Sequence, residues 1–82
     1  MDQIARTAGQ IGAALRRRRR QLGLTQAALG EKTGLRQATV SALEKGEQSA
    51  QLRTLLDVMS VLNLEISIRE RSRAAAKIED VF

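Results

Sequence analysis

The sequence contains no cysteine, no histidine and no proline, and its one aromatic residue is Phe82. The absence of cysteine and histidine excludes disulfides, thiol catalysis, zinc fingers and imidazole acid–base chemistry. With a single aromatic side chain, modules that stack single-stranded bases on Phe, Tyr or Trp are disfavoured. We also find no nucleophile–base arrangement and no glycine-rich phosphate loop. The sequence therefore predicts no enzyme, no catalytic residue, no metal site and no cofactor.

Long apolar runs are missing too, because none approaches the roughly 18 residues of a membrane span, and no signal peptide precedes the domain. We therefore expect a cytoplasmic protein. The 82 residues suit one small domain, for which oligomerisation is a common source of extra stability. Lys and Arg number 14 against 9 Asp and Glu, a net charge of +5. Such a basic domain suits a polyanion, and nucleic acid is the first candidate.

Residues 25–44, TQAALGEKTGLRQATVSALE, have the pattern of a helix, a tight turn and a second helix. Thr25 is a good N-cap, Gln26 to Thr33 makes about two turns, and Gly34 suits a left-handed helix end. Two short helices joined by a few residues with a glycine form the helix-turn-helix pattern. The second helix of that pattern can lie in a DNA major groove.

The second helix is predicted to start at Leu35 or Arg36 and to run to Lys45. Val40 and Leu43 are three residues apart and share its inner face. The opposite face carries short or amide side chains, which can read base edges, in place of the Glu and Lys of an ordinary solvated face. Gln37, Ala38 and Ser41 supply these side chains, Lys45 lies on the same face, and Arg36 and Thr39 flank it. The alternative is a small helix with an unremarkable polar face.

Thr7 and Gln10 form the pattern of a capping box, which predicts a helix from Ala8 to Leu22 that ends at Gly23. Residues 16–20 of this helix are consecutive arginines, which must lie on all its sides. The predicted inner stripe comprises Ile11, Leu15 and Leu22, with Ala8 and Ala14 beside it. Arg16 and Arg20 are one turn apart and repel, a cost that a nearby phosphate backbone would remove. The alternative for Arg16 and Arg17 is a solvated basic face.

Arg19 differs from its neighbours because it follows Leu15 by four residues and so falls on the buried stripe. Glu44 follows Val40 by four residues and also falls beside an inner face. A buried charge needs a partner. We therefore predict a structural Arg19–Glu44 pair that sets the angle of the second helix of the motif.

In the first helix of the motif, Leu29 is the clear core residue, and Gly30 indicates a close approach of another helix. A further helix is predicted over about residues 50–62, with Ser49 as its cap. Its broad apolar stripe comprises Leu52, Leu55, Leu56, Met59 and Leu62.

The spacing of apolar residues changes over residues 64–69 from that of a helix to that of a strand. Leu64, Ile66 and Ile68 alternate there with polar residues. One strand is not stable alone, and this chain has no second one. The simplest partner is the same strand of another copy across a two-fold axis, which predicts a homodimer. The alternative is irregular coil over the core. Residues 70–82 are predicted to be a flexible tail after the domain of residues 1–69, with Phe82 as a docking residue.

The segment TQAALGEKTGLRQATVSALEKG resembles the lambda-repressor-like helix-turn-helix domains of phage repressors and XRE-type regulators, over about residues 10–62. The resemblance implies a mainly α fold of four to five helices, here followed by the single strand. It also implies that Gln37 reads a base and that Arg19 pairs with Glu44. Together with the basic residues, it predicts DNA-phosphate contacts by Gln26, Thr39, Lys45 and Arg16.

LRQATVSALE followed by TLLDVMSVLNLEISI is similar to the HipB antitoxins of HipBA toxin–antitoxin pairs. The resemblance implies a dimer joined by an intersubunit sheet, a palindromic DNA operator and a HipA-like kinase toxin as partner. The base contacts it implies are made by Arg36, Gln37, Ala38 and Ser41. Phe82 would engage the toxin, although HipB ends in Trp and this tail is short. The alternatives are a stand-alone phage or plasmid-type repressor and a protein-interaction module that does not read DNA.

Overall fold

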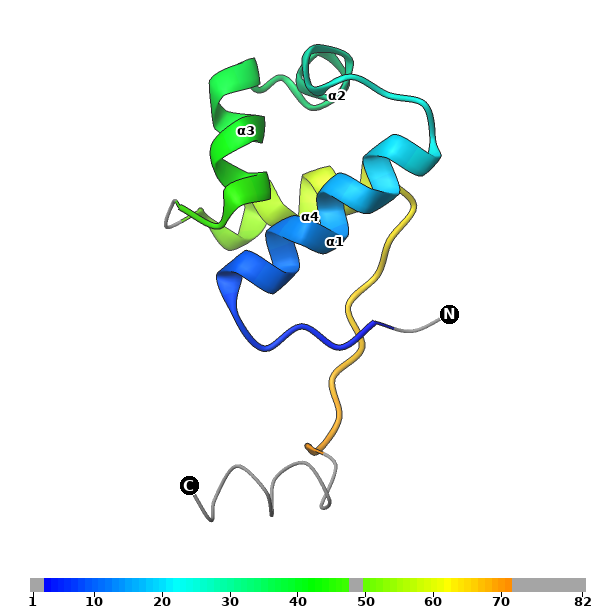
Figure 1. Ribbon diagram of the computed structural model, residues 1–82, viewed down its shortest axis with the longest axis vertical. Coiled ribbons are helices and arrows are strands. Elements are labelled where there is room, and N and C mark those ends of the chain that lie inside the picture. The colour runs from blue at the N-terminus through cyan, green and yellow to red at the C-terminus, as the bar shows by residue number, and fades with distance from the viewer. Residues whose placement is uncertain (1–2, 48–49, 72–82) are drawn as a thin grey trace.

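The computed structural model describes residues 3–47 and 50–71, and every regular element in those ranges is an α-helix. Helix α3 contacts both α1 and α2, and α2 also contacts α4. Figure 1 shows the short turn that joins α2 to α3 and the irregular segment that leaves the helices after α4. In chain order the helices are α1 (Ala8–Gln21), α2 (Gln26–Thr33), α3 (Gln37–Lys45) and α4 (Leu52–Val61). None of these four described helices has the length and the apolar run needed to span a membrane.

The ends of α2 follow from local chemistry. The Thr25 hydroxyl accepts a hydrogen bond from the Ala28 N–H at 3.0 Å, which satisfies one of the free donors of the first turn. Gly34 ends the helix in the left-handed conformation, with φ +73°. Both predicted bounds of α2 are therefore confirmed. Helix α3 begins at Gln37, because the backbone of Arg36 is extended and serves as the N-cap.

The buried core draws on all four helices. A cluster of apolar side chains, each no more than 9% exposed, fills the space between them: Leu15, Leu29, Val40, Leu43, Val58, Met59 and Leu62. Half-buried apolar residues surround this cluster: Ile11, Leu24, Leu35, Leu55, Val61 and Leu64. The core thus fixes the inner faces of α2 and α3 and leaves their opposite faces at the surface.

Three residues that were predicted to lie in the buried apolar stripes of α1 and α4 are exposed instead. Leu22 is 43% exposed, and Leu52 and Leu56 are 67% and 46% exposed, whereas Val58 is only 1% exposed. Helix α4 carries more apolar positions than its neighbours cover, so the face of Val58 is buried and that of Leu52 is not. The predicted cap Ser49 lies outside the described residues, and the helix itself begins after Gln51.

Two glycines mark places where backbones meet. A Cβ at Gly30 would lie 2.6 Å from the carbonyl oxygen of Leu35, so the close approach predicted there is made by the turn before α3. A Cβ at Gly12 would lie 2.5 Å from the carbonyl oxygen of Leu43 and would also clash with that of Glu44. Gly12, which sequence reasoning did not single out, therefore lets α1 approach the backbone of α3 directly.

The predicted strand is not formed in the described part of the chain, where residues 64–71 are irregular. Leu64 packs against the core and its N–H donates to the Met59 carbonyl at 2.8 Å, but Ile66 and Ile68 are 49% and 94% exposed. The physical reason is that no other segment among the described residues pairs with the backbone groups of this one. Of the predicted tail, Glu70 and Arg71 are described and exposed, and Phe82 lies outside the described residues.

Candidate nucleic-acid interface

Helix α3 presents the polar face that the sequence predicted. Gln37, Ala38 and Lys45 are exposed, as is the N-cap Arg36, and Ser41 is half-buried beside them. Because Gln37, Ser41 and Lys45 are spaced by four residues, they follow one line along the helix. A helix of this width fits a B-DNA major groove about 12 Å wide, where amide and hydroxyl groups can bond base edges.

The predicted ion pair holds α3 against α1. Arg19 Nε donates to Glu44 Oε2 at 2.6 Å, and Arg19 Nη2 donates to Glu44 Oε1 at 3.1 Å, so the pair is bidentate. The side chains are 9% and 3% exposed. Arg19 Nη1 also donates to the carbonyl oxygen of Leu24 at 2.7 Å. In the described residues no buried side-chain nitrogen or oxygen lacks a partner, so this buried network is fully satisfied.

The contact with Glu44 favours the charged form of Arg19. The hydrogen bond with Glu44 raises the pKa of Arg19 above its ordinary value, and the nearby carboxylate charge acts in the same direction. Burial acts in the opposite direction but does not prevail. Arg19 therefore stays charged throughout the neutral range and functions as a fixed structural cation.

Gln26 joins this network, which sequence reasoning did not foresee. Its Nε2 donates to Glu44 Oε1 at 3.1 Å, so one carboxylate ties together α1, α2 and α3. The amide nitrogen of Gln26 carries a second hydrogen, which remains available to a phosphate oxygen. Thr39, the other phosphate contact implied by the family resemblance, is half-buried on the flank of α3.

The side chains of the arginine run, residues 16–20, point in different directions and contact different partners. Arg18 Nε donates to the carbonyl oxygen of Leu62 at 2.9 Å, and Arg17 Nη2 donates to Gln3 Oε1 at 2.8 Å. The Arg18 contact joins α1 to the carboxyl end of α4, where a cation is favoured. Sequence reasoning predicted neither contact, because helical spacing does not mark Gln3 or the backbone carbonyl of Leu62 as a partner for an arginine.

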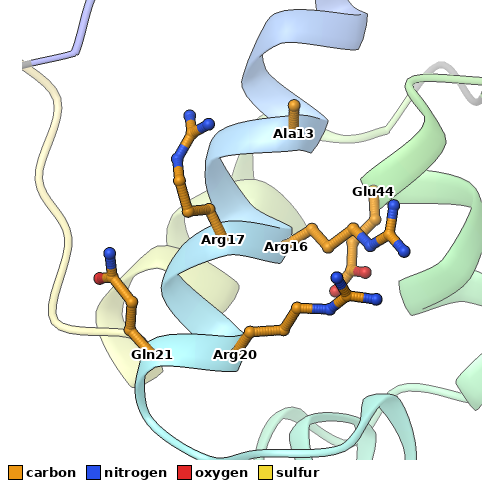
Figure 2. A pocket seen from close by; sticks show the side chains of 6 residues that line it. All are labelled: Ala13, Arg16, Arg17, Arg20, Gln21 and Glu44. Atoms are coloured by element: carbon orange, nitrogen blue, oxygen red, sulfur yellow. The ribbon is translucent and has the colours of Figure 1, made fainter.

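Arg16 and Arg20 line two open cavities between α1 and α3. The larger, of about 590 Å³, is bordered by Ala13, Arg16, Arg17, Arg20, Gln21 and Glu44. Figure 2 shows Arg16 and Arg20 reaching toward Glu44, with Arg17 pointing away from them. The smaller, of about 290 Å³, is bordered by Arg16, Arg19, Arg20, Gln26, Ser41, Glu44 and Lys45.

The smaller cavity is bordered by half of the eight residues predicted to contact DNA. The smaller cavity brings together Arg16, Gln26, Ser41 and Lys45 from three helices. Arg36 and Gln37 lie at the opposite end of α3 from Lys45. No group of acidic, cysteine or histidine side chains in the described residues is arranged to hold a metal ion.

Comparisons with known proteins agree with this geometry. The helix-turn-helix family model HTH_3 matches residues 15–68. Antitoxin HipB of Escherichia coli O6:H1 (strain CFT073) and of Escherichia coli K12 are each 30% identical over 66 residues, which cover 80% of this chain and 70% and 75% of theirs.

Solved structures show the same fold. A HipB–O4 20mer complex and a HipA–HipB–O2–O3 complex each match with a TM-score of 0.78 and 28% identity, over 87% of this chain and all of the matched chain. The second of these two structures contains HipA as well as HipB. The chain therefore belongs to the HTH_3 helix-turn-helix family, in which the HipB antitoxins are its relatives.

Proposed function

We propose that this protein is a sequence-specific, dimeric DNA-binding repressor that controls its own promoter as the antitoxin of a HipA-like kinase. The observation that carries the proposal is the outward face of α3, where Gln37 and Ala38 are exposed while Glu44 on the inner side is locked by Arg19. A rigidly held helix with amide, hydroxyl and methyl groups on its free face is suited to reading base edges. In this role Arg36, Gln37, Ala38 and Ser41 contact bases.

The proposed dimer uses the segment after α4. Ile66 and Ile68 expose 49% and 94% of their surface in the single chain. In a strand, both would lie on the same face as Leu64. Pairing this segment with its copy across a two-fold axis satisfies the backbone groups and buries the isoleucines. Two recognition helices then read half-sites about 34–36 Å apart on a palindromic operator.

The toxin partnership rests on the HipB relatives, one of which is seen in a HipA–HipB–O2–O3 complex. We assign Phe82 as the toxin-docking residue, since it is the sole aromatic side chain of the sequence. An aromatic ring at an interface contributes a large apolar contact at little entropic cost.

The DNA-reading claim is tested by fluorescence anisotropy on DNA from directly upstream of the gene, with a scrambled duplex for comparison. Wild type should prefer its upstream DNA, and Gln37→Ala should lose about 1–3 kcal/mol of that preference. Gln21→Ala is the matched control, because Gln21 is an exposed glutamine on α1. Equal binding of wild type to both duplexes would exclude sequence-specific repression and favour the protein-interaction module.

The toxin claim is tested separately by titrating the protein with the kinase encoded beside its gene. Tight binding by wild type and at least tenfold weaker binding by Phe82→Ala support the antitoxin assignment. A gene without a neighbouring kinase, or a kinase that does not bind, would leave a stand-alone phage or plasmid-type repressor. Because the kinase titration uses no DNA, its result does not depend on the operator measurement.

A further inference from the structure

The side chains of Arg16 and Arg20 are aimed at the same place. Both are exposed, both border the two cavities between α1 and α3, and Figure 2 shows both guanidinium groups extending toward α3. They are one helical turn apart, so they repel each other and gain nothing from this arrangement by themselves. This arrangement would suit an anionic ligand between them.

The acidic residue in the cavity cannot be that ligand. Glu44 is 3% exposed at its side chain, and both of its oxygens are engaged by Arg19, with Gln26 as a third donor. In the described residues, neither Arg16 nor Arg20 forms an ion pair or a side-chain hydrogen bond. The buried pair neutralises itself at the floor of the cavity, so the positive charge above it remains uncompensated.

The cavity adjoins the recognition face of α3. Ser41 and Lys45 border the smaller cavity together with Arg16 and Arg20. Lys45 is exposed and continues the line of Gln37 and Ser41 along α3. A duplex whose major groove receives this face would bring the adjoining sugar–phosphate backbone over the cavity, and guanidinium groups bind phosphate oxygens in bidentate fashion.

We propose that Arg16, Arg20 and Lys45 form a phosphate clamp that binds the DNA backbone beside the groove read by α3. The inference deepens the proposed DNA binding and rests on it. Within the arginine run, Arg18 and Arg19 then hold the fold together, whereas Arg16 and Arg20 hold DNA. Phosphate contacts carry no base information, so the clamp adds affinity equally to every duplex and makes binding more sensitive to salt.

The test is the salt dependence of binding for single variants of neighbouring arginines. Anisotropy titrations between about 50 and 200 mM salt are made on upstream and scrambled duplexes. Arg20→Ala and Arg16→Ala should each flatten the slope of log Kobs against log[salt] by about 0.9 per protomer, equally on both duplexes. Arg17→Ala removes the same charge from a side chain that borders only the larger cavity, donates to Gln3 and points away from Arg16 and Arg20 in Figure 2. This variant should leave the slope within about 0.3 of wild type.

Two results would overturn the clamp. If Arg17→Ala and Arg20→Ala changed the salt slope equally, the salt dependence of binding would reflect net charge alone. An unchanged slope for Arg16→Ala and Arg20→Ala would show that neither touches phosphate. The proposed function is decided by the preference between the two duplexes, whereas the clamp is decided by the slope that both share. Circular dichroism melts check each variant, and because these residues are exposed their folding should match wild type.

Discussion

Arg19 Nε donates to Glu44 Oε2 across 2.6 Å, and this contact joins residues 25 positions apart in the sequence. The same carboxylate receives Gln26, so the first three helices meet at one buried charge pair. Removing either partner of a buried pair leaves an uncompensated charge. The orientation of α3, and with it the proposed recognition face, therefore depends on a contact that lies behind that face.

Glu44→Ala should lower the free energy of unfolding by about 3–5 kcal/mol, because it strands the Arg19 guanidinium in a site that is 9% exposed. Urea denaturation followed by circular dichroism measures the change. Replacing both partners, as Arg19→Met with Glu44→Leu, should cost less than the sum of the two single losses, since no buried charge remains. Additive losses in the double variant would show that the two side chains are not energetically coupled.

Gly12→Ala should destabilise the protein by about 1–3 kcal/mol, since the new methyl group would overlap the carbonyl oxygens of Leu43 and Glu44. The matched control is Gly9→Ala in the same helix, where a Cβ would meet only the Thr7 hydroxyl at 3.9 Å. That variant should show no loss of stability. The melting temperatures of the two variants, compared with that of wild type, test this difference. If Gly12→Ala melted at the wild-type temperature, α1 could shift away from α3 at little cost in free energy.

Arg18→Ala should cost about 1–2 kcal/mol, because the carbonyl oxygen of Leu62 at the end of α4 loses a charged donor at 2.9 Å. Arg20→Ala provides the comparison, since that side chain is exposed and should leave stability unchanged. Both are measured by urea denaturation at one salt concentration. If the two variants unfold at the same urea concentration, the contact to Leu62 contributes no net stability.

Replacing Ile66 and Ile68 together with lysine should convert the proposed dimer to monomer, because four like charges would meet in the paired segment and its apolar face would be lost. Sedimentation equilibrium measures the mass. Ser67→Lys is the control and should remain dimeric, since the side chain of residue 67 would lie on the opposite face of the strand from Ile66 and Ile68. A double variant that remains fully dimeric would place the interface elsewhere, for example on the exposed Leu52 and Leu56 of α4.

The sequence by itself determined the features that depend on a few neighbouring residues. Thr25 and Gly34 set the ends of α2 where they were predicted, because a cap hydroxyl and a left-handed glycine act within about one turn. The outward face of α3 followed from Val40 and Leu43, which are 1% and 8% exposed, because helical periodicity places the remaining residues opposite them.

Only the tertiary structure decided which of several equivalent surfaces is covered. Periodicity alone did not distinguish the buried Val58 from the exposed Leu52, because α4 is apolar over more than one face. Nor did it reveal that Arg18 bonds the carbonyl of a residue 44 positions away, or that Gly12 admits the backbone of α3. These outcomes depend on how close the helices approach one another, and that distance is set by long-range packing of the core.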